Sequence, residues 1–112
     1  MSEGDEQQVA MQLILTAGDV KKIAFNGIHL AKKGQIKAAQ QSFKAAAKRL
    51  GEGHQQQAQY LSDHAADSAG PSLLMVHAQD HLSMAMTTIE LGQEIVALYE
   101  QLQLNQLLKA KH

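Results

Sequence analysis

Two histidines and an aspartate interrupt the apolar segment from Leu73 to Leu82, and these are the side chains in the sequence best suited to chemistry. His77 and His81 are four residues apart and Asp80 lies between them, so all three share one turn of a helix. Imidazole can act as a nucleophile, a base or a metal ligand near neutral pH, and a carboxylate binds hard cations. The residue types alone leave three interpretations open: a catalytic histidine, a histidine metal site, or hydrogen-bonded polar groups in a packed helix.

The helix that carries these residues is predicted to run from about Ser72 to Lys109, directly after the helix-breaking pair Gly70-Pro71. One stripe of this helix follows alternating steps of three and four residues and places the histidines on a packed face. It comprises Leu74, His77, His81, Met84, Thr88, Leu91, Ile95, Leu98 and Leu102. A second stripe, turned by about 100°, comprises Met75, Ala78, Leu82, Ala85, Ile89, Gly92, Val96 and Tyr99. Two apolar stripes need two partners, so we expect the chain's own helices to cover one and another copy the other.

Two further helices precede this one, with expected bounds of 5–33 and 35–68 and with Gly34 between them. Their expected core residues are Val9, Leu13, Ala17, Val20, Ala24, Ile28 and Ala31, followed by Ile36, Ala39, Phe43, Ala46, Leu50, Tyr60 and Leu61. Gly51 and Gly53 weaken the second helix, which we expect to be locally soft but continuous. The pattern predicts a single all-α domain over residues 1–112, folded as an antiparallel three-helix bundle.

The composition excludes several classes of protein. There is no cysteine, so disulfides, thiol nucleophiles and cysteine-ligated zinc are ruled out, and a cytoplasmic location is expected. No apolar run approaches the roughly 18 residues that a membrane-spanning helix needs, and no signal peptide is visible.

The charges are unevenly distributed along the sequence. Residues 21–49 hold eight of the ten Lys and Arg residues and no Asp or Glu. Only Phe25 and Phe43 are aromatic within this block, and no nucleic-acid-binding motif accompanies it, so nucleic acid is not an expected partner. A solvated face of a helical hairpin, or a docking surface for a protein, explains the block better.

A family resemblance emerges from the histidine segment. The run Ser-Leu-Leu-Met-Val-His-Ala-Gln-Asp-His-Leu at 72–82, followed by Met84-Ala85-Met86, resembles the signature of the lactose/cellobiose-type enzyme IIA components of the bacterial sugar phosphotransferase system. The resemblance extends to Ala17-Gly18, to the turn at 31–35 and to Glu52-Gly53-His54, although the family usually carries a better helix former at Gly53. It implies a nine-helix homotrimer, whereas spacing alone does not distinguish a trimer from a dimer.

The resemblance also implies a function as a phosphocarrier. His77 would accept a phosphoryl group from the carrier protein HPr and pass it to a cysteine of a cognate enzyme IIB, during uptake of a disaccharide such as lactose, cellobiose or chitobiose. His81 would either orient His77 or contact the phosphoryl group, or be a buried, hydrogen-bonded residue. Asp80 could orient an imidazole or neutralise it, and the resemblance implies a third role, in which it meets its symmetry mates on the trimer axis and binds a divalent cation, expected to be Mg²⁺. No organic cofactor and no membrane insertion are implied.

Two other functions compete with this interpretation. The first is a helical metal-binding protein that uses His77, Asp80 and His81, and the second is a regulatory interaction module without phosphoryl transfer. His54 is expected either to contribute to the crevice beside the third helix or, more simply, to lie on the helix surface. His29, His64 and His112 are expected to face solvent without a role.

Overall fold

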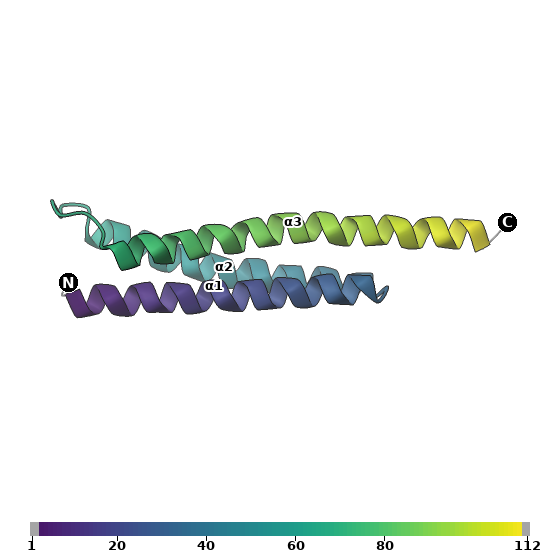
Figure 1. The fold of residues 1–112 in the computed structure, drawn as a ribbon, viewed down its shortest axis with the longest axis horizontal. Coiled ribbons are helices and arrows are strands. Elements are labelled where there is room, and N and C mark those ends of the chain that lie inside the picture. Colours follow the sequence, from purple (N-terminus) through teal and green to yellow (C-terminus); the bar gives the residue numbers. More distant parts are fainter. Residues whose placement is uncertain (1–2, 111–112) are drawn as a thin grey trace.

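The structure, a computed structural model, describes residues 3–110 and consists of three helices, α1 (Glu3–Lys32), α2 (Ile36–Asp63) and α3 (Leu73–Ala110). Helices α1 and α2 form an antiparallel hairpin, and α3 runs beside both of them in the direction of α1 (Figure 1). The molecule is a rod of 68 × 18 × 17 Å. The described residues contain no strand, so the predicted all-α, three-helix architecture is confirmed.

The first connection is a tight turn around Gly34. This glycine has a φ of +85°, which a residue without Cβ adopts at little cost, and the N–H of Gln35 donates to the carbonyl of Leu30 at 2.9 Å. The expected break at Gly34 is therefore correct, with the helix bounds shifted by one or two residues.

The second helix ends at Asp63, so the expected end near Ser68 is wrong. The His64 ring stacks on the Tyr60 ring at a centroid distance of 4.2 Å, and His64 Nδ1 lies 2.9 Å from the Tyr60 carbonyl oxygen. The Tyr60 carbonyl oxygen thus accepts the backbone N–H of His64 at 3.1 Å and also lies against the imidazole of the same residue. His64 was expected to face solvent, but its side chain is only 12% exposed.

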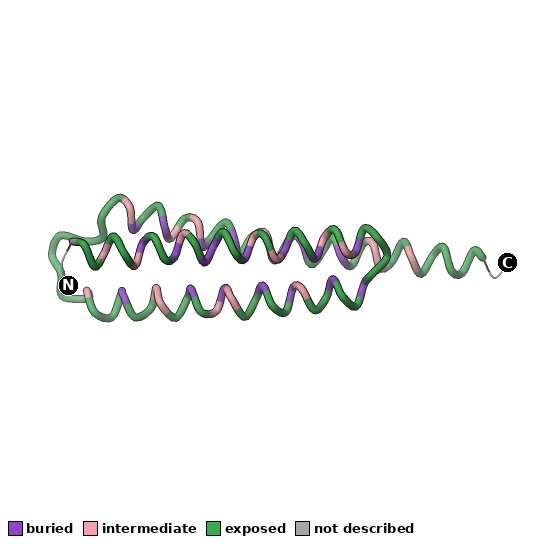
Figure 2. The backbone as a smooth tube through the Cα atoms, turned by 90° about the horizontal axis from the view of Figure 1, so that it is seen from below, coloured by how far each residue is buried: buried purple, intermediate pink, exposed green. Residues whose placement is uncertain are grey.

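The core lies along the line where the three helices meet (Figure 2). On α3 it contains the second of the two predicted stripes, from Met75 to Val96, and not the stripe that carries the histidines. On α1 and α2 most of the expected positions are buried, whereas Leu61 is 52% exposed and its assignment to the core was wrong. Alanines make up much of this core, so the helix backbones approach closely.

Phe43 of α2 lies between a glycine of α1 and a glycine of α3. A Cβ placed on Gly27 would lie 2.7 Å from Phe43 Cε2, and one placed on Gly92 would lie 2.5 Å from Phe43 Cζ. Both distances are far below the 3.5–4.0 Å, approximately, that two carbon atoms prefer. The ring therefore occupies the space that two missing side chains leave, and it aligns the three helices along the rod.

At Gly53, α2 approaches side chains of α1 and α3 closely for a second time. A Cβ there would lie 2.9 Å from Leu82 Cδ2 and 3.1 Å from Thr16 Cγ2, whereas a Cβ on Gly51 would meet nothing within 4 Å. The second helix continues through both glycines, as predicted. Thr16, Gly53 and Leu82 therefore lie at one level of the rod, one residue from His81.

The last turns of α3 extend beyond the hairpin (Figures 1 and 2). Gln103 Nε2 donates to the Gly34 carbonyl at 2.9 Å, which ties α3 to the turn between α1 and α2. After this contact Leu104, Leu107 and Leu108 are about half exposed. The chain's own helices thus leave this end of α3 uncovered.

Candidate functional site

His77 and His81 lie on successive turns near the start of α3 and face one another. Their Nε2 atoms are 3.1 Å apart, the ring centroids are 4.5 Å apart, and the ring planes meet at 84°. A hydrogen bond between two ring nitrogens requires a proton on one of them and a lone pair on the other. In this arrangement, therefore, one of the two Nε2 atoms carries the proton and donates, and the other accepts through its lone pair.

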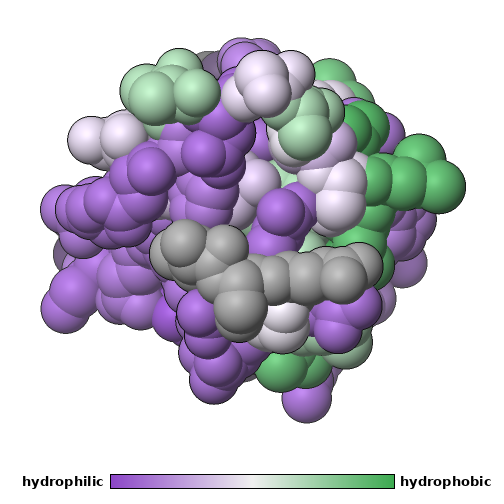
Figure 3. All heavy atoms as spheres, turned by 90° about the vertical axis from the view of Figure 1, so that its left-hand side faces the viewer, coloured by the Kyte–Doolittle hydropathy of each residue, from purple (hydrophilic) through white to green (hydrophobic). Residues whose placement is uncertain are grey.

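The histidines lie on the surface of the chain. His77 is exposed and His81 is partly buried, so the structure excludes His77 as a core residue of a single chain. Most of the rest of their stripe is also exposed, with Leu91 61% and Leu98 60% exposed, whereas Leu74 and Thr88 are partly buried. The expectation that the histidines face a packed core is therefore wrong within one chain. Figure 3 shows the end of the rod near the α2–α3 loop, where the most hydrophobic residues gather mainly on the right-hand side and hydrophilic residues dominate the left.

Asp80 is exposed, and within residues 3–110 its carboxylate does not contact the two imidazoles through a hydrogen bond or an ion pair. Nor do the described residues contain any group of three His, Cys, Asp or Glu side chains that could hold a metal ion. One chain therefore supplies a single carboxylate at this position, and a carboxylate-bound metal would need Asp80 from several copies.

The start of α3 is held by two side chains that precede the histidines. Ser72 Oγ accepts the N–H of Met75 at 3.1 Å, and Glu6 Oε1 of α1 accepts the N–H of Ser72 at 2.7 Å. Its hydrogen bonds with Ser72 lower the pKa of Glu6 below the ordinary value. The Ser72 cap is recognisable as a serine just before an apolar run, whereas nothing in the sequence pattern identifies Glu6. These bonds fix where α3 begins and hence where His77 lies.

The hydroxyl of Tyr60 belongs to the same region. Burial raises the pKa of Tyr60, and the nearby Glu6 carboxylate adds to this effect. Tyr60 thus packs under the start of α3 as a neutral phenol. It supports the helix that bears the histidines without reaching either ring.

His54 is not brought together with the histidine pair. It is exposed on α2 and forms no hydrogen bond or ion pair with a described residue. The simpler of its two expected placements, on the helix surface, is therefore correct. His29 is exposed as expected, and His112 lies outside the described residues.

The antiparallel hairpin separates the charges toward the two ends of the rod. Because α2 runs back along α1, residues 3–20 and 50–89 share the half that contains the histidines. These segments contain no Lys or Arg and eight acidic residues: Glu3, Asp5, Glu6, Asp19, Glu52, Asp63, Asp67 and Asp80. The block 21–49, with its eight basic residues, surrounds the turn at the other half. At the boundary, Arg49 binds Asp19 at 3.1 Å and Glu52 at 2.7 Å.

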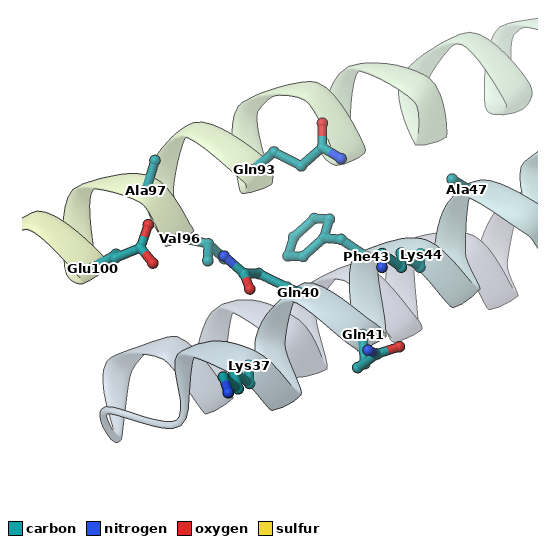
Figure 4. Close-up of a pocket in the computed structure, with 10 residues that line it drawn as sticks. All are labelled: Lys37, Gln40, Gln41, Phe43, Lys44, Ala47, Gln93, Val96, Ala97 and Glu100. Atoms are coloured by element: carbon teal, nitrogen blue, oxygen red, sulfur yellow. The ribbon is translucent and has the colours of Figure 1, made fainter.

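A groove between α2 and α3 lies far from the histidines. It has a volume of about 600 Å³ and is lined by Phe43, Val96 and Ala97 between Lys37 and Lys44 on one side and Glu100 on the other (Figure 4). Val96 is 19 residues beyond His77, which corresponds to about 28 Å along a helix. The groove therefore takes no part in chemistry at the histidines.

None of the three helices is long and apolar enough over the described residues to cross a membrane.

Comparisons with known proteins agree on one family. The family model for the lactose/cellobiose-specific IIA subunit of the phosphotransferase system matches residues 8–100. The chain is 36% identical to the lichenan-specific enzyme IIA component of Bacillus subtilis, covering 86% of this chain and 88% of the relative. It is 38% identical to the cellobiose-specific EIIA component of Lactococcus lactis, covering 88% and 86% of the two chains.

Solved structures give the same result. The cellobiose-specific enzyme IIA of Bacillus anthracis superposes with a TM-score of 0.82 at 32% identity, covering 92% of this chain and 94% of that one. A chain from the complex of the chitobiose IIA with HPr, from the phosphotransferase system of Escherichia coli, superposes with a TM-score of 0.79 at 31% identity, covering 92% and 99%. The chain therefore belongs to the lactose/cellobiose-specific IIA family of the bacterial sugar phosphotransferase system.

Proposed function

We propose that this protein is a cytoplasmic phosphocarrier that accepts a phosphoryl group from phosphorylated HPr on His77. It then passes the group to a cysteine of a cognate enzyme IIB, during uptake and phosphorylation of a disaccharide of the lactose, cellobiose or chitobiose class. The observation that carries the proposal is an exposed imidazole, paired through Nε2 with a second imidazole, in a chain of the IIA family. The solved complex of a related IIA with HPr supports HPr as the donor.

The transfer needs little covalent machinery. A neutral imidazole nitrogen of His77 attacks phosphorus, the new N–P bond forms as the N–P bond of the donor breaks, and the electron pair returns to the donor's imidazole. In the second step a cysteine thiolate of enzyme IIB attacks the same phosphorus, and the His77 nitrogen recovers its lone pair. Positioning of an exposed nitrogen is the main requirement, and the start of α3 meets it.

His81 acts as the positioning partner in this scheme. With its proton on Nε2, His81 donates to His77 Nε2 before transfer, which keeps that nitrogen unprotonated. This hydrogen bond breaks as the donor approaches, and the lone pair of His77 Nε2 then attacks phosphorus. Once His77 Nε2 carries the phosphoryl group, the same N–H is within reach of a phosphoryl oxygen. This arrangement favours Nε2 of His77 as the accepting nitrogen.

The exposed stripe of α3 supports assembly into the homotrimer that the family resemblance implies. Its leucines and Ile95 are the kind of surface that a parallel helix of another copy covers. Three copies of Asp80, on the same side of α3, would bring three carboxylates to a shared axis, and carboxylate oxygens suit Mg²⁺. The single carboxylate per chain is compatible with such a shared structural metal, which has no step in the transfer.

The experiment that tests the proposal is phosphorylation in a purified system of phosphoenolpyruvate, enzyme I and HPr. We expect the mass of each chain to increase by one phosphoryl group, and fragments prepared under alkaline conditions to carry it at His77. The His77→Ala variant should keep its helical content and oligomeric state but gain no phosphoryl group, and His54→Ala should behave as the unaltered protein. Acceptance by the His77→Ala variant, or none by the unaltered protein with active HPr, would refute the proposal.

A further inference from the structure

The histidine pair has the geometry of a bidentate metal site. The two Nε2 atoms are 3.1 Å apart. Two nitrogens bound to one tetrahedral zinc at about 2.0–2.1 Å lie about 3.3 Å from each other. A metal ion could therefore replace the proton between the two rings with a small adjustment of the side chains.

A metal ion can reach both rings from the solvent. His77 is exposed and His81 is partly exposed, and neither ring has any other hydrogen bond or ion pair with a described residue. No backbone carbonyl or carboxylate among residues 3–110 therefore competes for the nitrogens. If a phosphoryl group carried by another protein can reach His77, the smaller hydrated metal ion can also reach it.

The surrounding charge favours a cation over an anion at this site. The half of the rod around the pair contains eight acidic residues and no Lys or Arg within residues 3–20 and 50–89. The helix α3 itself carries four acidic residues, Asp80, Glu90, Glu94 and Glu100, and no basic residue before Lys109. A divalent ion at the imidazoles would thus be attracted by the field of the molecule.

From this geometry we infer that His77 and His81 together bind one divalent transition metal ion, of the type Zn²⁺, Ni²⁺ or Cu²⁺, through their Nε2 atoms. Imidazole suits these ions, whereas the hard Mg²⁺ prefers oxygen, so this site is distinct from any carboxylate site of Asp80. No third His, Cys, Asp or Glu side chain of the described residues completes it. Water fills the remaining positions, and the ion exchanges readily.

The metal site has a consequence that rests on the proposed function. The metal and the phosphoryl group need the same lone pair of His77, so each excludes the other. A bound metal ion therefore inhibits phosphoryl transfer reversibly, and a chain phosphorylated at His77 does not bind the metal at this site.

The first test uses unphosphorylated protein without an affinity tag, titrated with Ni²⁺ and with Zn²⁺ by calorimetry in a buffer that does not bind metals. We expect one ion per chain. His77→Gln and His81→Gln should each lower the affinity by about tenfold or more, because a single imidazole loses the benefit of a second donor fixed beside it. The matched controls His29→Gln and His54→Gln, on exposed histidines of α1 and α2, should bind as the unaltered protein does. Circular dichroism checks that all four variants stay helical.

Three results would overturn the metal site: no binding, binding that survives in His77→Gln/His81→Gln, or an equal loss in the two controls. The second test measures phosphorylation by HPr with and without Zn²⁺, and we expect the ion to slow it in the unaltered protein. The ratio of the phosphorylation rates with and without Zn²⁺, measured also on His81→Gln, shows whether the ion acts on the donor proteins instead. An equal slowing in that variant would overturn the exclusion of one ligand by the other.

The two proposals fail separately. Metal binding with no phosphorylation in metal-free buffer would refute the phosphocarrier function and leave the metal site standing. Phosphorylation at His77 without metal binding would refute the metal site and leave the function standing.

Discussion

The packing of Phe43 between two glycines makes a sharp prediction for Gly92→Ala. The new Cβ would lie 2.5 Å from Phe43 Cζ and 2.6 Å from Cε1, about 1 Å closer than carbon atoms prefer. The ring cannot move away freely, because its other edge already lies against Gly27. Overpacking of this kind costs roughly 1–3 kcal/mol, and the better helix propensity of alanine returns about 0.5–1 kcal/mol. We therefore expect a net destabilisation of up to about 2.5 kcal/mol.

Urea unfolding followed by far-ultraviolet circular dichroism measures this difference, at one protein concentration because self-association adds to apparent stability. Gly51→Ala is the matched control, since its Cβ would meet nothing within 4 Å, and it should stabilise the protein by about 0.5–1 kcal/mol. Phe43→Leu should cost less in the Gly92→Ala background than alone, because the shorter side chain relieves the crowding. If Gly92→Ala proved as stable as Gly51→Ala, the account of the packing around Phe43 would be wrong.

Three further predictions concern the start and the open face of α3. Ser72→Ala removes the cap of α3 and should cost about 1 kcal/mol in the same urea assay, and an unchanged midpoint would count against the cap. The folded-state pKa of Glu6 is lowered, so its bond to Ser72 stabilises the fold above the ordinary value of 4.5 and is lost as the pH falls through the lower folded pKa. Glu6→Gln should therefore be less stable than the unaltered protein at neutral pH, with a gap that closes in acid, and a gap independent of pH would contradict this. Leu91→Glu places a charge on the exposed stripe and should shift the mass measured by light scattering from that of the proposed trimer toward that of a monomer, whereas Glu90→Gln should not.

The periodicity of the sequence was sufficient to predict three helices and the residues that one of them buries. The stripe of α3 from Met75 to Val96 was identified by its spacing, and the structure buries it. Spacing did not reveal which stripe the hairpin covers, because both are apolar. Residue size carried the missing signal: the covered stripe contains Ala78, Ala85 and Gly92, which let another helix approach, whereas the open stripe has larger side chains.

Other features depended on contacts between distant residues. The early end of α2, where His64 stacks on Tyr60, falls in a segment whose neighbouring alanines suit a helix, so the sequence pattern did not indicate it. The two histidine rings are close because the residues are four apart on one helix. Glu6 and Ser72, in contrast, are 66 residues apart in the sequence, so their contact could not be predicted from local spacing. Local pattern therefore predicted the pair, and only the tertiary structure showed what holds it in place.

The separation of charge along the rod has a kinetic consequence for any molecule that approaches the histidines. Small free anions, such as inorganic phosphate or nucleotides, are repelled by the half of the molecule in which His77 lies. A protein whose docking face is positive is instead drawn toward that half, at a rate that falls as salt screens the field. For the proposed function, the charge pattern would favour transfer of a phosphoryl group from a basic carrier protein over reaction with free phosphate in solution.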